Sequence, residues 1–171
     1  CALPISDKFD RYKLVLAPGL MMMNAAQKSA LVTSSAQVIL GPRTAARDND
    51  FTVPVPLPPY IPDMDITVAR VESLRADMPI AVSEGGNICG YREILESTEQ
   101  HCLTTLNSEP VAVQKQNVIY LGAWLDIEGW RSLISPLAAA RGLEILNLPD
   151  GVRIRDTETE RFWFNYDSVS H

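Results

Sequence analysis

Two pairs of acidic residues have a spacing that could support catalysis. Asp48 and Asp50 lie two residues apart, and Glu93 and Glu96 flank an Ile-Leu dipeptide. Two carboxyl groups that cleave a glycosidic bond with retention must lie about 5–5.5 Å apart, one as nucleophile and one as acid/base. An Asp-x-Asp pair is more typical of a turn, and charges around an apolar dipeptide are typical of a partly exposed element. The sequence therefore predicts no catalytic residue in this chain.

Thiol, metal and phosphate chemistry have weak support. Cys1, Cys89 and Cys102 form no C-x-x-C pair and fit no zinc spacing. The residues around Cys89, NICG, do not match the G-x-C-x-G elbow of a nucleophilic cysteine. The chain also lacks the glycine patterns that cradle phosphates. We expect no cofactor and no metal, and three cysteines without a disulfide framework favour a reducing cytoplasmic location.

The most promising polar segment is the loop from Gly41 to Phe51. It follows an apolar run typical of a parallel strand, and α/β sheets usually place their sites at the carboxyl edge. Its charged side chains could form ion pairs across a subunit interface, wall a pocket, or simply pair locally within the loop. Trp124, just past another strand, could join the same surface. The candidate interface or pocket-wall residues are Arg43, Thr44, Arg47, Asp48, Asp50, Phe51 and Trp124.

The elements that would position this loop begin with a strand, a helix and a strand. Residues 12–17 form a nearly continuous apolar run, as in a strand covered on both faces. Asn24, with Gln27 three residues later, has the pattern of a helix N-terminus. Residues 36–40 form the next strand. The three elements predict a βαβ unit with a right-handed crossover.

The middle of the chain changes character. Five prolines between Pro54 and Pro62 exclude a helix or a central strand. The apolar residues among them favour an ordered, interfacial loop, although a flexible loop remains an alternative. Residues 66–71, 101–106, 109–113 and 117–122 read as strands, and residues 79–95 are ambiguous.

A second helix and a hairpin end the chain. Asp126 precedes a helical pattern whose apolar face includes Trp130, and after Gly142 the hydrophobic period changes to two. Apolar positions on both sides of a charged turn at 156–161 predict an antiparallel hairpin. We place a domain boundary near residues 148–151.

Composition excludes several classes of protein. The 171 residues are too few for a (β/α)8 barrel, which needs about 250. The net charge of −6 disfavours nucleic acid as a partner, because phosphate binding needs clustered Lys and Arg. No run approaches the ~20 apolar residues of a membrane span. The first residues, CALPISDKFD, do not resemble a signal peptide.

Several short segments of the sequence resemble segments of one family, and they occur in the same order. They are YKLVLAPGL at 12–20, VILGPRTAARDNDF at 38–51, PLPP at 56–59, ARVESLR at 69–75, VIYLGAWLD at 118–126, ARGLE at 140–144, LPDGVRIR at 148–155 and FNY at 164–166. Together they resemble the family 42 glycoside hydrolases, the bacterial β-galactosidases. The resemblance covers the middle trimerisation domain and the start of the C-terminal β domain.

This resemblance implies a fold and a division of labour. Residues 1–148 would form a flavodoxin-like, class I glutamine-amidotransferase-like α/β domain with a mostly parallel sheet. It would lack the family's first strand and helix, which leaves an apolar strand edge that favours association. Residues 149–171 would begin a β-sandwich.

The resemblance also implies a function. The catalytic glutamates of the family lie in a separate barrel. We therefore expect a non-catalytic, pocket-supporting part of an oligomeric β-galactosidase, a trimer by resemblance. The alternative is a free-standing flavodoxin-like interaction or ligand-binding module. A small independent enzyme would need a convergent polar pocket that these residues do not supply.

Overall fold

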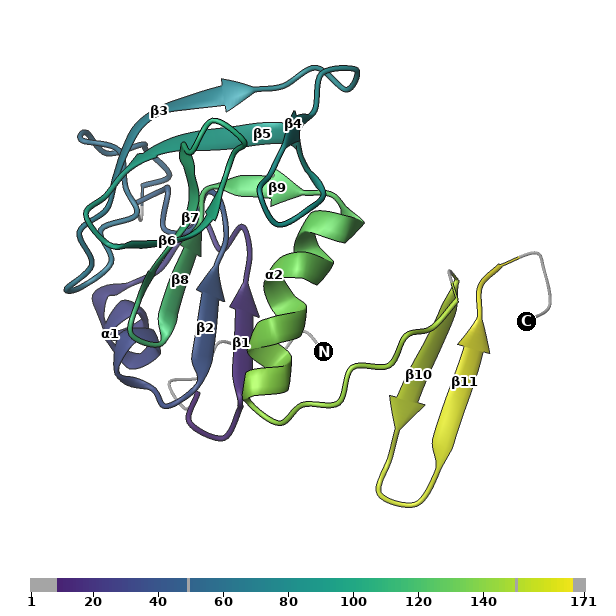
Figure 1. Ribbon diagram of the computed structural model, residues 1–171. Helices are drawn as coiled ribbons and strands as arrows, with labels where there is room; N and C mark the ends of the chain where they lie inside the picture. The colour runs from purple at the N-terminus through teal and green to yellow at the C-terminus, as the bar shows by residue number, and fades with distance from the viewer. Residues whose placement is uncertain (1–8, 49, 150, 168–171) are drawn as a thin grey trace.

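The computed structural model describes residues 9–48, 50–149 and 151–167. Its centre is a five-stranded sheet in the order β1-β2-β8-β7-β6 (Figure 1). The strands are β1 (Leu14–Ala17), β2 (Gln37–Leu40), β6 (Gln100–Thr104), β7 (Pro110–Lys115) and β8 (Val118–Leu121). β1, β2 and β8 run parallel, whereas β7 is antiparallel to both β8 and β6. The sheet is therefore mixed.

A second sheet lies against the carboxyl edge of the first. It contains β3 (Thr67–Ser73), β4 (Ile80–Ala81), β5 (Asn87–Glu96) and β9 (Ala123–Leu125), and the three other strands all pair with β5 in antiparallel fashion. The short segment between β8 and β9 passes the chain directly from one sheet to the other. Glu93 on β5 is thereby tied to this crossing, since its N–H donates to the carbonyl of Gly122 at 2.6 Å.

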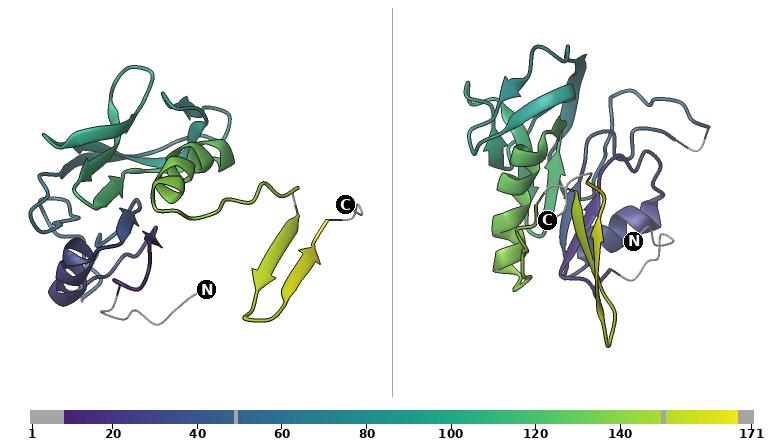
Figure 2. Two further views of the ribbon diagram at one scale, coloured as in Figure 1. Left: turned by 60° about the horizontal axis from the view of Figure 1, so that its bottom comes forward. Right: turned by 90° about the vertical axis from the view of Figure 1, so that its right-hand side faces the viewer.

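Two helices cover opposite faces of the five-stranded sheet (Figures 1 and 2). Helix α1 (Ala25–Thr33) begins at Asn24, whose side chain accepts from the N–H of Gln27 while the Gln27 side chain accepts from the N–H of Asn24. Helix α2 (Ile127–Ala140) begins at Asp126, whose carboxylate accepts from the N–H of Gly129. Both N-termini are those that the sequence predicts.

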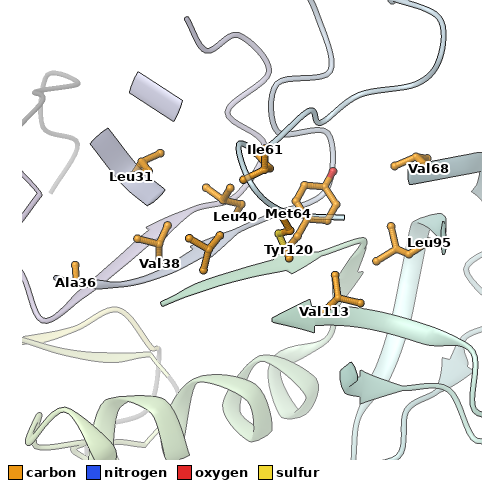
Figure 3. Packing of buried hydrophobic residues seen from close by; sticks show 11 residues of the cluster. Leu31, Ala36, Val38, Leu40, Ile61, Met64, Val68, Leu95, Val113 and Tyr120 are labelled. Atoms are coloured by element: carbon orange, nitrogen blue, oxygen red, sulfur yellow. The ribbon is translucent and has the colours of Figure 1, made fainter. Parts of the chain in front are cut away.

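The alternating side chains of the central strands divide the core into two clusters. Val38, Leu40 and Tyr120 face α1 and the proline-rich loop, as Figure 3 shows for this cluster. Ile39 and Leu121 face α2 and the second sheet. Loop residues contribute directly to the first cluster, since Ile61 is 5% exposed. The proline-rich segment is therefore ordered and partly buried.

The C-terminal strands stand apart from this body. β10 (Val152–Asp156) and β11 (Arg161–Asn165) form the antiparallel hairpin that the sequence predicts. An extended segment joins it to α2, and Figure 1 shows the hairpin separate from the sheets. Every residue of β11 is exposed, including Trp163 at 62%. Two strands cannot enclose a core, so the aromatic side chains remain open to solvent.

The expected flavodoxin-like, mostly parallel α/β fold is wrong. Of the residues, 38% lie in strands and 15% are helical, and the described part of the chain contains two helices. A parallel pair needs a long crossover, usually helical, whereas antiparallel strands can be joined by a tight turn. The turns at Ser108 and Gln116 are tight, and both residues have positive φ, 65° and 51°. The chain between 67 and 125 therefore folds back and forth as antiparallel strands.

Candidate site at the carboxyl edge of the five-stranded sheet

The predicted loop leaves the carboxyl end of β2 through a backbone that fits closely between its neighbours. A Cβ added to Gly41 would lie 2.5 Å from the Cα of Pro18, so only glycine allows this approach. Arg43 and Ala45 then adopt left-handed conformations, with φ of 63° and 55°. Such conformations cost an L-residue about 1–2 kcal/mol each, so the surrounding contacts must hold them.

Thr44 provides one of these contacts. It is fully buried. Its hydroxyl donates to the carbonyl of Ala17 at 3.1 Å and accepts from the N–H of Gly41 at 3.2 Å. The structure therefore places Thr44 inside the loop, where it ties the ends of β1 and β2 together, and not on a surface that a partner or a sugar could touch.

Glu93 provides the second contact. It reaches from β5 to the loop and is 6% exposed. One carboxylate oxygen accepts from the N–H of Arg43 at 2.8 Å and from the hydroxyl of Tyr91 at 3.1 Å; the other accepts from the hydroxyl of Tyr120 at 2.7 Å. We call these four residues, Arg43, Tyr91, Glu93 and Tyr120, the Glu93 cluster. It joins β5, β8 and the loop after β2.

The electrostatics of the Glu93 cluster follow from this burial. Desolvation raises the pKa of the Glu93 carboxyl above its usual value, and the three hydrogen bonds only partly offset the effect. Burial and the neighbouring carboxylate also raise the pKa of Tyr91 and Tyr120, so both hydroxyls remain donors. The side chain of Arg43 is exposed, with its guanidinium 5.8 Å from the centre of the Tyr91 ring.

The rest of the loop is held mainly by hydrogen bonds. The carboxylate of Asp48 accepts from the N–H of Asp50 at 3.0 Å and from the N–H and hydroxyl of Thr52. The bonds from Thr52 lower the pKa of the Asp48 carboxyl. The guanidinium of Arg47 donates to the carbonyl of Phe51. Within the described part of the chain, no ion pair joins an arginine of this loop to an aspartate, so local Arg–Asp pairing does not hold the loop.

The surface of the loop and the segment after it carries apolar side chains. Phe51 is 58% exposed, and Val53, Val55 and Tyr60 are exposed as well. Lys28 on α1 secures the far end by donating to the carbonyl of Pro59 at 3.0 Å. An ordered segment with several exposed large apolar residues is typical of a surface that contacts another protein.

Trp124 belongs to the same edge of the sheet. It is half-buried on β9, and its ring lies about as close to Gly19 as ordinary van der Waals contact allows, 3.5 Å from a Cβ built there. Since Pro18 contacts Gly41, Trp124 and the loop flank the same junction. The structure thus places Trp124 beside the start of the loop, near Gly19 and Gly41, with Thr44 inside the loop.

The acidic pairs weighed as catalytic carboxylates do not converge. Glu93 is buried and Glu96 is exposed, because residues three apart on a strand point to opposite faces. The carboxylate of Asp48 already accepts hydrogen bonds from Asp50 and Thr52 of its own loop. Cys89 and Cys102 are free, and Cys1 lies outside the described residues. No group of three or more metal-ligating side chains gathers within the described ranges. Neither helix there is long and apolar enough to cross a membrane.

The fold is that of a β-galactosidase domain. The structure aligns with a β-galactosidase from the psychrophilic Marinomonas ef1 at a TM-score of 0.82 and 27% identity, over 93% of this chain and 25% of that one. An alignment with a β-galactosidase from Halorubrum lacusprofundi has a TM-score of 0.86 at 23% identity, over 97% of this chain and 28% of the other. The second likeness shows the shared fold alone.

The particular family follows from sequence. The family described as the β-galactosidase trimerisation domain matches residues 3–144, so this chain belongs to it. A β-galactosidase from Thermus thermophilus is 31% identical over 161 residues, and one from a Thermus species is 29% identical. Each alignment covers 91% of this chain and 25% of the relative. The chain therefore spans about a quarter of the length of these curated relatives.

Proposed function

We propose that this chain is a non-catalytic part of a β-galactosidase, whose task is self-association and support of a galactoside pocket carried elsewhere in the enzyme. The observation that carries the proposal is the family match over residues 3–144. The whole enzyme would hydrolyse terminal β-D-galactosides with carboxylates outside these residues.

The geometry supports an assembly role in two ways. The loop after β2 is held by Thr44 and the Glu93 cluster, so its shape exists before any partner binds. A preformed contact surface loses less conformational entropy on binding than a flexible one. The segment also exposes Phe51, Val53 and Val55. Burial of such side chains against a second copy would favour association by about 25 cal/mol per Å² of apolar surface, before the costs of binding.

Support of a sugar pocket is the finer part of the proposal. Arg43 follows β2 and Trp124 follows β8, so both lie beyond the carboxyl ends of parallel strands, where ligands commonly bind. A half-buried indole and an exposed guanidinium are groups that can contact a sugar or line the pocket of an adjoining domain. In this interpretation galactoside reaches the chain only through the rest of the enzyme.

The test combines mass and activity on one purified sample. Light scattering after size exclusion gives the mass of the species in solution, and a chromogenic β-galactoside gives its activity. A multimer without activity is expected. Turnover that survives repurification would overturn the proposal, because it requires a carboxylate pair within this chain. A free-standing ligand-binding module would instead be monomeric and inactive.

A further inference from the structure

The Glu93 carboxylate has an unusual environment for a buried charge. It receives three hydrogen bonds, yet all three donors are neutral: two tyrosine hydroxyls and one backbone N–H. Glu93 takes part in none of the ion pairs of the described residues. The nearest positive influence is the guanidinium of Arg43, which stabilises the charge from the rim of the cluster.

Stability alone does not account for such a group. Removing a carboxylate from water costs several kcal/mol, which hydrogen bonds repay only in part, and well-packed apolar residues are often as stable or more so. Buried ionisable groups that are costly in this way concentrate at functional sites. Glu93 lies where β5, β8 and the loop after β2 meet. The geometry therefore indicates that its role is to position the loop.

The hydrogen bond to Arg43 has a specific consequence. It fixes the N–H of a residue whose φ is 63°, and thereby selects one direction for the loop as it leaves β2. The Arg43 side chain then lies over Tyr91, itself bound to Glu93, with its charge open to solvent. The same carboxylate thus sets both the path of the backbone and the ring beneath the guanidinium.

We propose that Glu93 is the positioning residue of the assembly surface formed by Arg43, Phe51, Val53 and Val55: it holds the loop in the shape that contacts a second copy of this chain. This inference rests on the proposed self-association. The partner follows from the family, which is described as a trimerisation domain. The exposed apolar side chains of the same segment, Phe51, Val53 and Val55, are the surface that a second copy would cover.

The decisive variant is Glu93→Gln in the full chain. A carboxamide keeps the shape of the side chain but has one acceptor oxygen and no charge, so at least one of the three hydrogen bonds must be lost or reverse its direction, and none keeps a charged acceptor. Hydrogen exchange of the loop amides should become faster. Self-association, followed by sedimentation velocity over a concentration series, should weaken by about tenfold, as loss of one charge-assisted hydrogen bond implies.

Glu96→Gln is the matched control, because it removes the same charge from the same strand at an exposed position. It should leave exchange and association unchanged. Arg43→Gln should weaken association without changing exchange of the loop. Tyr91→Phe removes one donor and keeps the carboxylate, so it tests the cluster if Glu93→Gln folds poorly.

The outcomes separate this inference from the proposed function. Faster exchange and weaker association in Glu93→Gln, with Glu96→Gln unchanged, support it. Faster exchange with unaltered association overturns the positioning role while self-association stands. Unaltered exchange overturns the anchoring of the loop. A wild-type chain that stays monomeric overturns both proposals, whatever its exchange pattern.

Discussion

Tyr120→Phe measures how strongly the Glu93 cluster holds the two sheets together. The ring is 1% exposed and packs with Leu40 and Met64, so a phenylalanine occupies the same space (Figure 3). Only the 2.7 Å hydrogen bond to the second Glu93 oxygen is lost. A hydrogen bond to a charged group contributes about 1.5–3 kcal/mol, and the abandoned oxygen stays buried. We therefore expect the free energy of unfolding to fall by about 2 kcal/mol.

Urea denaturation followed by tryptophan fluorescence gives this free energy, and the midpoint should move while the slope stays constant. In a thermal scan the same loss lowers Tm by roughly 4–8 °C for a chain of this length. Tyr166→Phe is the control, since that side chain is 75% exposed and should change stability little. If Tyr120→Phe is as stable as the wild type, the hydroxyl contributes nothing and the account of the Glu93 cluster is refuted.

Three further changes test the burial of Glu93, the packing at Gly41 and the N-terminal cap of α1. Burial raises the pKa of Glu93 in the folded chain above its ordinary value of 4.5, so the folded chain keeps this proton to a higher pH than the unfolded chain does. The stability that the protonated group contributes is therefore present at low pH and is lost as the pH rises through the folded-state pKa. Denaturation of Glu93→Gln and wild type from about pH 4.5 to 7 should show the variant gaining relative stability as pH rises; the opposite trend would mean a lowered pKa. Gly41→Ala should cost about 1–3 kcal/mol in urea denaturation, because its methyl group meets the backbone of Pro18. A Gly41→Ala chain with an unchanged urea midpoint would refute the packing argument. Asn24→Ala removes the capping box of α1 and should lower the free energy of unfolding by about 1 kcal/mol, whereas an unchanged midpoint would show that the cap is dispensable.

The sequence predicts those parts of the fold that local chemistry determines. Asn24 and Asp126 cap the two helices, and the period of two after Gly142 marks the hairpin, because each signal lies within a few residues of its consequence. The sheet class depends on which strands pair across the chain. Here the tight turns at Ser108 and Gln116 were the available signal for antiparallel pairing.

In the candidate site, too, the sequence predicts what local chemistry determines and misses what depends on distant contacts. The loop after β2 is predictable, since an apolar strand followed by charged residues indicates a carboxyl-edge loop. Glu93 is not, because its partners Arg43 and Tyr120 lie 50 and 27 residues away in the sequence. One local signal was present: Tyr91 and Glu93, two residues apart on a strand, must share a face. The buried position of Thr44 likewise depends on Ala17, far from it in the chain.

Sedimentation equilibrium of the purified chain tests the central claim most directly. We predict a reversible association whose heaviest species has three times the 18.9 kDa mass of one chain, and which weakens in Glu93→Gln but not in Glu96→Gln. A single species of 18.9 kDa at every concentration would contradict the account, because the domain would then hold its loop in place without assembling.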